Sequence, residues 1–163
     1  MMASPIASAD APPAMTAETL WQLKRIGNPA LSPDGRQAVY SVTAFDDEND
    51  KGDADLWAVA TAGGEPRRLT STKGNESEPA WSPDGKWIAF VAKRGDDQQS
   101  QLYVIAADGG EATRVGDIPT GVSAPKWFPD SAHIAFISRV WPDLTDWKKA
   151  GERLKSRDES KMK

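Results

Sequence analysis

The one histidine of the chain, His133, limits the acid–base and nucleophilic chemistry that its 163 residues could perform. A Ser-His-Asp triad formed within these residues would need this imidazole as its general base. His133 occupies the place that Gln37 and Trp87 hold in two similar segments, and no catalytic partner is evident nearby in the sequence. A structural role is therefore favoured over catalysis. The G-x-S-x-G sequence that presents a nucleophilic serine is absent, because GVSAP at 121–125 lacks the closing glycine.

A run of acidic residues at 46–56, DDENDKGDADL, is a second candidate site, with calcium as the ligand. The EF-hand calcium pattern needs oxygen ligands at its fifth and twelfth positions. Counted from Asp47, these positions hold Lys51 and Ala58, so the pattern fails. A solvated loop between two inner strands is favoured over a metal site. We assign no catalytic, cofactor-binding or metal-binding residue and expect no cofactor.

Tryptophan is abundant, with seven residues, and aromatic side chains can form platforms for ligands. Trp81 and Trp127, however, occupy the same position as Leu31 in a repeated segment, which indicates packing between repeated units. Trp141 and Trp147 fall outside the repeat. They could face a partner domain or a substrate chamber, but a packing role is favoured.

Composition excludes several classes of partner. The formal net charge of −4 gives no electrostatic reason to expect nucleic acid or an anionic membrane as a partner. No apolar run approaches the roughly 18–20 residues needed to cross a bilayer. Cysteine is absent, which excludes disulfides but leaves the compartment undecided. The first residues, MMASPIASADAPPA, lack the features of an intact signal peptide. A periplasmic location, with a signal peptide already removed, is favoured over a cytoplasmic one.

Three segments repeat one turn-and-strand pattern without gaps. They are ALSPDGRQAVYSV, AWSPDGKWIAFVA and KWFPDSAHIAFIS, at residues 30–42, 80–92 and 126–138. Their spacings of 50 and 46 residues are typical of propellers and solenoids. The proline presets the turn, and the glycine supplies the left-handed conformation that returns the chain as a hairpin. Ser131 replaces this glycine in the third copy, where its Cβ is expected to cost stability.

A second shared block completes the first two units. DLWAVATAGGEPRRLT at 55–70 and QLYVIAADGGEATRVG at 101–116 each predict a strand, a Gly-Gly turn and a polar outer strand. Arg67 and Arg68 are expected to face solvent on that outer strand. The strand after each of the three repeated turns is apolar on both faces, which is typical of strands buried between neighbouring sheets. Four antiparallel strands every 46–50 residues predict an all-β fold of β-propeller blades. A β-sandwich is disfavoured, because sandwiches rarely repeat one sequence in register.

The predicted organisation has three parts. Residues 1–15 form a disordered tail, and residues 16–27 form a short N-terminal helix that ends at Gly27. Residues 28–163 form an incomplete propeller, with two complete blades and one partial blade at about 28–71, 78–116 and 124–163. After Ser138 the repeat breaks, and the charged sequence RVWPDLTDWKKAGERLKSRDESKMK predicts a helical or partly disordered insertion in the third blade.

The number of blades has a consequence for the whole chain. Two blades and part of a third cannot close a ring, since propellers have about four to eight blades. The last unit lacks its outer hairpin and would expose an unpaired strand edge. We therefore expect a fragment of a longer protein that supplies the missing blades, and expect these residues not to form a stable monomer alone. Homo-oligomer formation stays open.

Several of these features together resemble a known family. They are the segment LWQLKRIGNPALSPDG, the SPDGKWIAF blades, the LWAVATAGGEPRRLT hairpin and the charged RLKSRDESKMK insertion. This combination resembles the start of a serine peptidase of the prolyl oligopeptidase family, in its acylaminoacyl-peptidase and dipeptidyl-peptidase V-like branch. The resemblance extends from about Thr16 onward. TolB-like propellers share the repeats, whereas the N-terminal helix and the charged insertion are more specific.

The resemblance implies an N-terminal propeller joined to a C-terminal α/β-hydrolase domain that cleaves peptides by Ser, Asp and His, through an acyl-enzyme. The propeller of such an enzyme restricts access to the active site and selects short peptides. No catalytic residue of that machinery maps onto this chain. The implied partners are the remaining blades, the hydrolase domain and short peptides, with no nucleic acid and no membrane. Dipeptidyl and acylaminoacyl release both stay open.

Two non-enzymatic alternatives remain. One is a TolB-like propeller that acts as a protein-binding scaffold in the periplasm. The other is a lectin-like or ligand-binding propeller.

Overall fold

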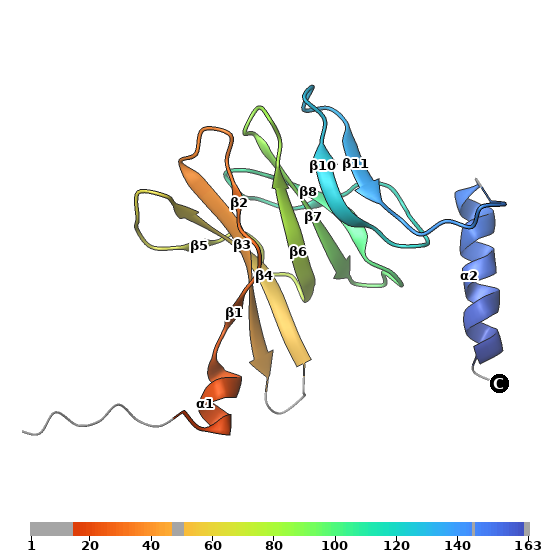
Figure 1. Cartoon of the computed structure of the whole chain (residues 1–163), viewed down its shortest axis with the longest axis horizontal. Helices are drawn as coiled ribbons and strands as arrows, with labels where there is room; N and C mark the ends of the chain where they lie inside the picture. Colours follow the sequence, from red (N-terminus) through yellow and green to blue (C-terminus); the bar gives the residue numbers. More distant parts are fainter. Residues whose placement is uncertain (1–14, 47–50, 145, 162–163) are drawn as a thin grey trace, which may run out of the picture.

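The structure is a computed structural model that describes residues 15–46, 51–144 and 146–161. Three antiparallel units, here called blades 1 to 3, lie side by side like the blades of a fan (Figure 1). Blade 1 contains β1 (Arg25–Ile26), β2 (Ala30–Leu31), β3 (Gln37–Asp46), β4 (Lys51–Ala60) and β5 (Arg67–Arg68). Blade 2 contains β6 (Gly74–Trp81), β7 (Trp87–Arg94), β8 (Gln101–Ala106) and β9 (Thr113–Arg114). Blade 3 contains β10 (Ser123–Trp127) and β11 (Ile134–Ile137), and the helices are α1 (Ala17–Gln22) and α2 (Trp147–Lys161).

Blades 1 and 2 are four-stranded antiparallel sheets, which confirms the predicted fold class. In blade 1, β3 lies between β4 and the two short strands β1 and β2, which together form the first strand of the blade. In blade 2, each of the strands β6 to β9 is antiparallel to its neighbour. One parallel pair, Ala54 with Asn75, joins β4 to β6. Within the described residues, blade 3 is the hairpin of β10 and β11.

Each Ser-Pro-Asp-Gly turn is held by its own serine and aspartate side chains. In the first turn, Oγ of Ser32 donates to Oδ1 of Asp34 at 2.6 Å and accepts from the N–H of Gln37 at 2.9 Å. The same carboxylate oxygen accepts from the N–H of Arg36 at 3.0 Å. Gly35 has a φ of 69°, in the left-handed region that glycine adopts without strain. The second turn repeats all of these contacts, so local chemistry determines where the strands reverse.

The third turn departs from this pattern. Phe128 takes the place of the serine, and the imidazole Nδ1 of His133 contacts Oδ2 of Asp130 at 2.6 Å instead. Oδ1 of Asp130 accepts from the N–H groups of Ala132 and His133 at 3.0 and 3.1 Å. Ser131 has a φ of 56°, so the third copy places a Cβ in the left-handed conformation, as predicted.

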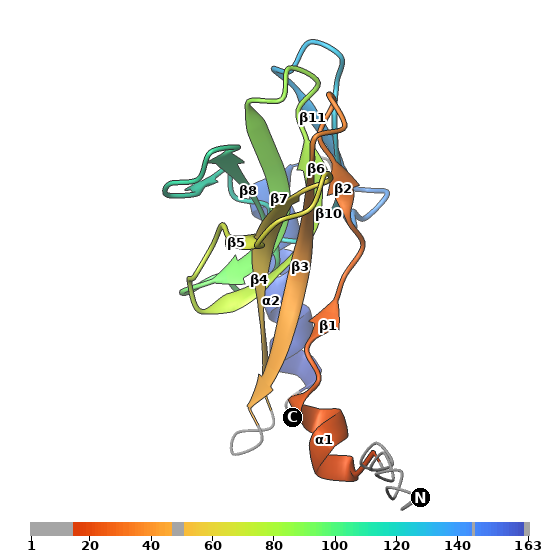
Figure 2. The same cartoon turned by 90° about the vertical axis from the view of Figure 1, so that its left-hand side faces the viewer.

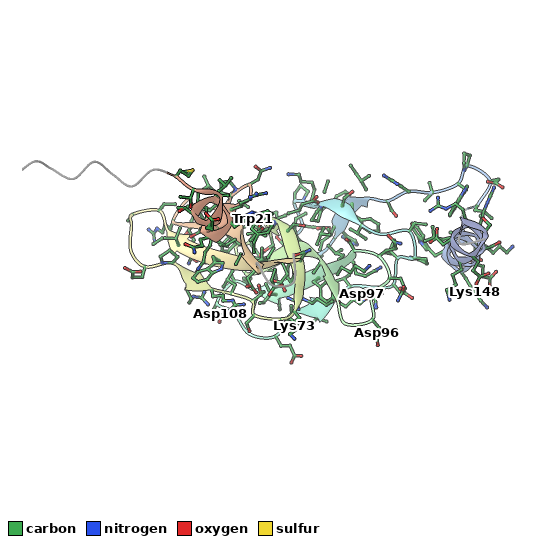
Figure 3. The ribbon with its side chains drawn as sticks, turned by 90° about the horizontal axis from the view of Figure 1, so that it is seen from below. Trp21, Lys73, Asp96, Asp97, Asp108 and Lys148 are labelled. Atoms are coloured by element: carbon green, nitrogen blue, oxygen red, sulfur yellow. The ribbon has the colours of Figure 1, made fainter. Side chains whose placement is uncertain are left out.

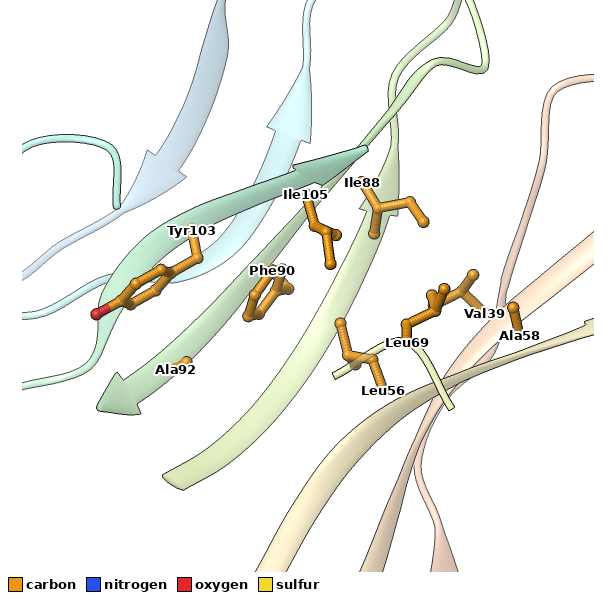
Figure 4. Close-up of a cluster of buried hydrophobic side chains, with 9 residues drawn as sticks. All are labelled: Val39, Leu56, Ala58, Leu69, Ile88, Phe90, Ala92, Tyr103 and Ile105. Atoms are coloured by element: carbon orange, nitrogen blue, oxygen red, sulfur yellow. The ribbon is translucent and has the colours of Figure 1, made fainter. Parts of the chain in front are cut away.

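Strand β7 is buried on both faces because a blade packs against each side of it. Ile88, Phe90 and Ala92 contribute to a cluster shared with blade 1 (Figure 4), whereas Ala89 and Val91 contribute to a cluster shared with blade 3. The first cluster consists of Val39, Leu56, Ala58, Leu69, Ile88, Phe90, Ala92, Tyr103 and Ile105. Burying one large apolar side chain contributes roughly 1.5–3 kcal/mol. The core therefore lies between blades rather than within one. The predicted burial on both faces is confirmed for β7, whereas Ala135 and Ile137 of β11 are exposed.

The N-terminal helix is shorter than the predicted range 16–27. It begins after Thr16, whose hydroxyl accepts a hydrogen bond from a backbone N–H of the first turn at 3.2 Å. It ends at Gln22, because Arg25–Ile26 pairs with β3 as a strand. Gly27 therefore does not end the helix. Its N–H donates to the carbonyl of Ser41 at 2.9 Å, and a Cβ there would collide with the Ser41 hydroxyl.

The charged C-terminal segment contains the predicted helix, α2. Ala150 is buried, and a Cβ on Gly151 would lie 3.0 Å from Cβ of Pro119 in the loop between blades 2 and 3. A glycine within a helix costs about 1 kcal/mol relative to alanine, and here it allows α2 to approach that loop closely. The end of the molecule opposite the turns carries α1 and the C-terminal end of α2 (Figures 1 and 2). In the described parts of the chain, no helix is long and apolar enough to cross a membrane.

The acidic run at 46–56 is largely strand rather than the predicted loop. Asp46 ends β3 and Lys51 begins β4, and the two residues are paired in register. The hairpin therefore extends into the run, because each strand supplies backbone partners for the other. Residues 47–50 and the predicted tail over residues 1–14 lie outside the described residues.

Candidate functional site

Two tryptophans make the same hydrogen bond across successive interfaces between blades, here called seams. Nε1 of Trp81 in blade 2 donates to the carbonyl of Ala30 in blade 1 at 3.1 Å. Nε1 of Trp127 in blade 3 donates to the carbonyl of Ala80 in blade 2 at 3.0 Å. The donors and the acceptors occupy equivalent positions in the repeat. The predicted role of these tryptophans in packing between units is confirmed.

Other polar contacts also cross the seams. The guanidinium of Arg67 donates to the carbonyl of Asp108 at 3.0 Å, so this residue is more than a solvated surface side chain. Between blades 2 and 3, Oε2 of Glu78 accepts from the N–H of Ala124 at 2.5 Å, and Oγ of Ser131 accepts from the N–H of Asp84 at 3.0 Å. Main-chain groups at the edges of the blades are therefore satisfied by side chains of the next blade.

A cleft of about 600 Å³ lies between the turns of blades 1 and 2. Its lining includes Trp81, Arg67 and the turn carboxylates Asp34 and Asp84. Hydrogen bonds from the serine hydroxyls of the two turns, followed by those from backbone N–H groups, lower the pKa of both carboxyls. The turn of blade 2 carries Gly85 where the turn of blade 3 carries a serine that bonds across its seam. This cleft can thus accept polar or cationic groups.

A buried group of charged side chains lies at the foot of the seam between blades 1 and 2. Glu76 is fully buried, where it accepts a hydrogen bond from the Thr70 hydroxyl and pairs with the guanidinium of Arg94. Asp55 is also buried and pairs with Arg68 at 2.5 Å. Burial is the largest influence on both acids and raises the pKa of Glu76 and of Asp55, although the neighbouring arginines oppose it. Glu76 of blade 2 accepts from Thr70, which follows β5 of blade 1, so this contact joins the two blades, whereas Asp55 and Arg68 both belong to blade 1.

Aromatic rings extend this group into blade 2. The guanidinium of Arg94 lies over the rings of Phe90 and Tyr103, at 5.1 and 4.8 Å from their centroids. The Tyr103 hydroxyl donates to Oδ2 of Asp97 at 2.8 Å, and Arg114 pairs with the other oxygen at 3.0 Å. Arg94 is therefore held by a carboxylate and by two π faces, which suit a planar guanidinium.

Sequence reasoning did not find this charged group. A signal was present, because Glu76 and Arg94 occupy the positions of Val122 and Val140 in the next unit. A carboxylate and a guanidinium that both replace valine in register indicate an ion pair inside the seam.

The structure gives His133 a partner that the sequence analysis missed. The imidazole contacts Asp130, three residues earlier, and its side chain is 75% exposed. Backbone N–H groups, that of Ala132 first, and the contact with His133 lower the pKa of Asp130 to about 2. The hydroxyl of the adjacent Ser131 is engaged with the backbone of blade 2. The contact between His133 and Asp130 thus stabilises the third turn, which agrees with the structural role predicted for His133.

The acidic run does not gather into a metal site in the part that the structure describes. Oδ1 of Asp53 accepts from the N–H of Gly74 at 3.3 Å, and Asp55 belongs to the buried charged group. In residues 15–46, 51–144 and 146–161, no group of three or more acidic, histidine or cysteine side chains could hold a metal ion. The calcium pattern considered from Asp47 onward lies partly outside the described residues.

A second, larger cleft of about 970 Å³ separates blade 2 from α2. Its lining carries both signs of charge, with Asp96 and Asp97 on the side of the blade and Lys148 and Lys155 on the helix. Figure 3 shows Lys148 and Trp21 at opposite ends of the molecule, with Asp96 and Asp97 between them. This cleft can accept a polar ligand but gives no single charge preference.

Blades 1 and 3 each keep one apolar face uncovered. Ile137 is 63% exposed, although the equivalent Val91 of blade 2 is 5% exposed beneath blade 3. On blade 1, Leu31 is 63% exposed at the position where Trp81 and Trp127 reach the preceding blade. The repeat thus carries apolar residues at positions where only a neighbouring blade would bury them.

Comparisons with known proteins agree with this architecture. Residues 51–150, more than half of the chain, match the family described as the tricorn protease N-terminal beta propeller domain. The chain is homologous to dipeptidyl-peptidase 5 of Porphyromonas gingivalis, with 40% identity over 85 residues, which are 52% of this chain and 12% of that protein. The chain thus corresponds to a small part of this relative, and its predicted resemblance to peptidase propellers is confirmed.

Two solved structures share the fold. Acylaminoacyl peptidase of Pyrococcus horikoshii superposes with a TM-score of 0.62 at 20% identity, covering 78% of this chain and 19% of that one. A putative TolB of Agrobacterium tumefaciens superposes with a TM-score of 0.58 at 27% identity, covering 76% of this chain and 41% of that one. The repeated blades, their seams and the match over residues 51–150 lead to one conclusion: the chain belongs to the family of the tricorn protease N-terminal β-propeller domain.

Proposed function

We propose that this chain forms blades of the N-terminal propeller of a serine peptidase that hydrolyses short peptides, and that the propeller gates and selects the substrate. The observation that carries the proposal is the 40% identity to a dipeptidyl-peptidase over more than half of the chain. Among the described residues, His133, Asp34 and Asp84 are engaged in turns and Glu76 in a seam, which supports a role in shaping a chamber. The nucleophile and its base would then lie in an α/β-hydrolase domain of the same protein.

The seams support further blades as the first partner. Ala30 and Ala80 accept indole hydrogen bonds, and Lys126 occupies the equivalent position in blade 3. We expect the neighbour of blade 3 to place a donor on the Lys126 carbonyl and an apolar face against Ile137. A sheet of the same kind, with a tryptophan at the repeat position, meets both requirements.

The test is covalent labelling of the intact protein with a fluorophosphonate probe, which reacts with activated serines. We expect labelling of the folded protein and none after heat denaturation. Hydrolysis of a dipeptidyl p-nitroanilide, compared with that of an N-acetylaminoacyl p-nitroanilide, then distinguishes the two modes of release. His133→Ala is the matched control. Its exposed side chain stabilises a turn and takes no part in catalysis under the proposal, so labelling should be unchanged. Absence of labelling in folded, intact protein contradicts the proposal.

A TolB-like scaffold is the second candidate. The 27% identity to a putative TolB, over 41% of that structure, favours it. This alternative predicts an intact protein that completes its propeller, reacts with no fluorophosphonate and hydrolyses neither substrate. The same experiment therefore separates the two candidates.

A further inference from the structure

A hollow of about 210 Å³, here called the arginine hollow, lies between α2 and the segment that follows β11. Arg139 and Arg157 both line it, and none of the described residues that line it is acidic. In a chain with a net charge of −4, a hollow with two guanidiniums and no carboxylate has a charge opposite to that of the whole. The adjoining cleft between blade 2 and α2, which shares Gln99 and Leu154 with the hollow, differs because its lining mixes acids and bases.

The two guanidiniums are accessible to an anion, since Arg139 and Arg157 are both exposed. Arg157 pairs with its sequence neighbour Asp158 at 3.5 Å, and both side chains are about half exposed. Such exposed pairs contribute about 0–1 kcal/mol, so a better-placed carboxylate can replace this one. Guanidinium groups bind carboxylates in a planar, two-pronged geometry, and two of them around one anion also relieve their mutual repulsion.

A third arginine orients an aromatic wall instead of contributing free charge. Both oxygens of Asp143 accept from the guanidinium of Arg153 at 2.9 Å, which neutralises it. The same guanidinium lies 5.3 Å from the centroid of the Trp141 ring and so fixes one face of the indole. Trp141, Val140 and Leu154 then form an apolar side of the hollow.

The hydroxyl of Thr120, which lines the hollow, is already hydrogen-bonded within the protein. Oγ of Ser138 donates to the carbonyl of Gly121 at 2.6 Å and lies 2.8 Å from the hydroxyl of Thr120. Because the Ser138 proton is used, Thr120 must donate its own proton to Ser138. The side-chain donors that remain for a ligand therefore include the amide of Gln99, the indole N–H of Trp141 and the two guanidiniums.

We propose that the arginine hollow binds a small organic carboxylate. Its carboxylate group pairs with Arg139 and Arg157, and its apolar part lies against Trp141, Val140 and Leu154. An inorganic anion would use the charges but leave the apolar wall uncovered, so a carboxylate with a short hydrocarbon chain fits better. The inference goes beyond the proposed peptidase function and does not depend on it.

The test is isothermal titration of the intact protein with 4-methylpentanoate, its neutral isostere 4-methylpentanamide, and inorganic phosphate. We expect the carboxylate to bind at least tenfold more tightly than the amide or phosphate. Arg139→Gln and Arg157→Gln should each weaken its binding about tenfold, since each removes one charge-assisted pair. Arg36→Gln is the matched control, because it removes an exposed guanidinium beside the turn of blade 1, which does not line the hollow. Binding should be unchanged.

Circular dichroism of each variant verifies its folding, which exposed substitutions at these positions should preserve. Carboxylate binding that survives both substitutions overturns the proposal. So does equal binding of the amide, or binding of phosphate as tightly as the carboxylate. A wild-type protein that binds none of the three ligands overturns it as well.

Discussion

At the scale of single residues, the turns show how local chemistry determines the path of the chain. The serine, aspartate and following backbone N–H groups of each Ser-Pro-Asp-Gly turn satisfy one another within six residues. The third turn replaces the serine by Phe128 and uses the imidazole of His133 on the same aspartate. The glycine of this turn is replaced by Ser131, whose hydroxyl accepts from the backbone of blade 2. The hydrogen bond offsets part of the cost of its left-handed backbone.

This compensation predicts the ranking of two substitutions at Gly85. Its φ is 72°, and a new Cβ would meet Cδ of Pro33 at 3.8 Å, so the cost comes from the backbone rather than from a clash. We expect Gly85→Ala to destabilise the intact protein by about 1–2 kcal/mol. Gly85→Ser should lose about 1 kcal/mol less, because its hydroxyl can accept from the N–H of Asp34 as Ser131 does from Asp84.

Urea unfolding of the intact protein measures both losses. Gly95 gives a matched control pair, since its φ is 52° and a Cβ there meets nothing within 4 Å. Alanine and serine should be equally destabilising at Gly95. Equal losses for the two substitutions at Gly85 would show that no hydroxyl contact forms across that seam.

At the scale of elements, the seam rather than the blade is the stabilising unit. Apolar side chains of β7 are divided between two clusters, and indole hydrogen bonds of 3.1 and 3.0 Å recur at successive seams. A buried charged group around Glu76 and Arg94 is added only to the first of the two seams, because the next unit has valines at both positions. Both seams therefore have an apolar cluster and an indole hydrogen bond, but only the first contains a buried ion pair.

The indole hydrogen bond predicts the effect of Trp81→Phe. The substitution keeps an aromatic ring but leaves the carbonyl of Ala30 without its donor. We expect a loss of about 1–3 kcal/mol in the free energy of unfolding. Trp147→Phe, on the exposed side of α2, is the control and should change it by less than about 0.5 kcal/mol. Chemical denaturation followed by circular dichroism measures both, and equal effects would remove the special role of the seam tryptophans.

The buried acids predict a pH dependence. Burial raises the pKa of Glu76 and Asp55 in the folded protein, so between their ordinary and raised values the folded state retains protons that the unfolded state has lost. This contribution to stability therefore falls as pH rises through that window. We expect Glu76→Gln to have a smaller gain in melting temperature than the wild type when the pH is lowered from 7 to 5.

The exposed Glu111→Gln serves as the control and should follow the wild type over the same pH range. Thermal melts at several pH values measure the difference between the variants. A steeper gain for Glu76→Gln than for the wild type would show that the ionised carboxylate is the stabilised form, with the Arg94 pair outweighing burial.

At the scale of the whole molecule, the uncovered apolar faces of blades 1 and 3 favour self-association of the isolated chain. Leu31 and Ile137 are exposed at positions that a neighbouring blade would cover. Exposed apolar sheet surface and unpaired strand edges promote association. We expect the 163-residue chain, expressed alone, to self-associate in gel filtration with light scattering. A compact monomer that melts cooperatively would contradict this expectation.

Ile137→Lys should therefore have opposite effects in two contexts. In the isolated chain it places a charge on the uncovered face, and self-association should decrease. In the intact protein the same charge would be buried beneath the neighbour of blade 3, and stability should fall by about 3 kcal/mol or more. Thr113→Lys, on the exposed outer strand β9, is the control and should change neither measurement. If Ile137→Lys left the stability of the intact protein unchanged, nothing would pack on that face.

The sequence by itself determined the turns, the blades and the burial of β7 on both faces, because each depends on residues close together in the chain or on a repeat that can be counted. It did not determine the end of α1, since pairing of Arg25–Ile26 with β3 competes with helix formation there. It also missed the Glu76–Arg94 pair and the arginine hollow. The pair joins two neighbouring strands of blade 2 at residues 18 apart in the chain, and the hollow joins α2 to the segment after β11. Such groups, which are distant in the chain, meet only once the strands are paired and α2 is packed, so the tertiary structure decides which of them come together.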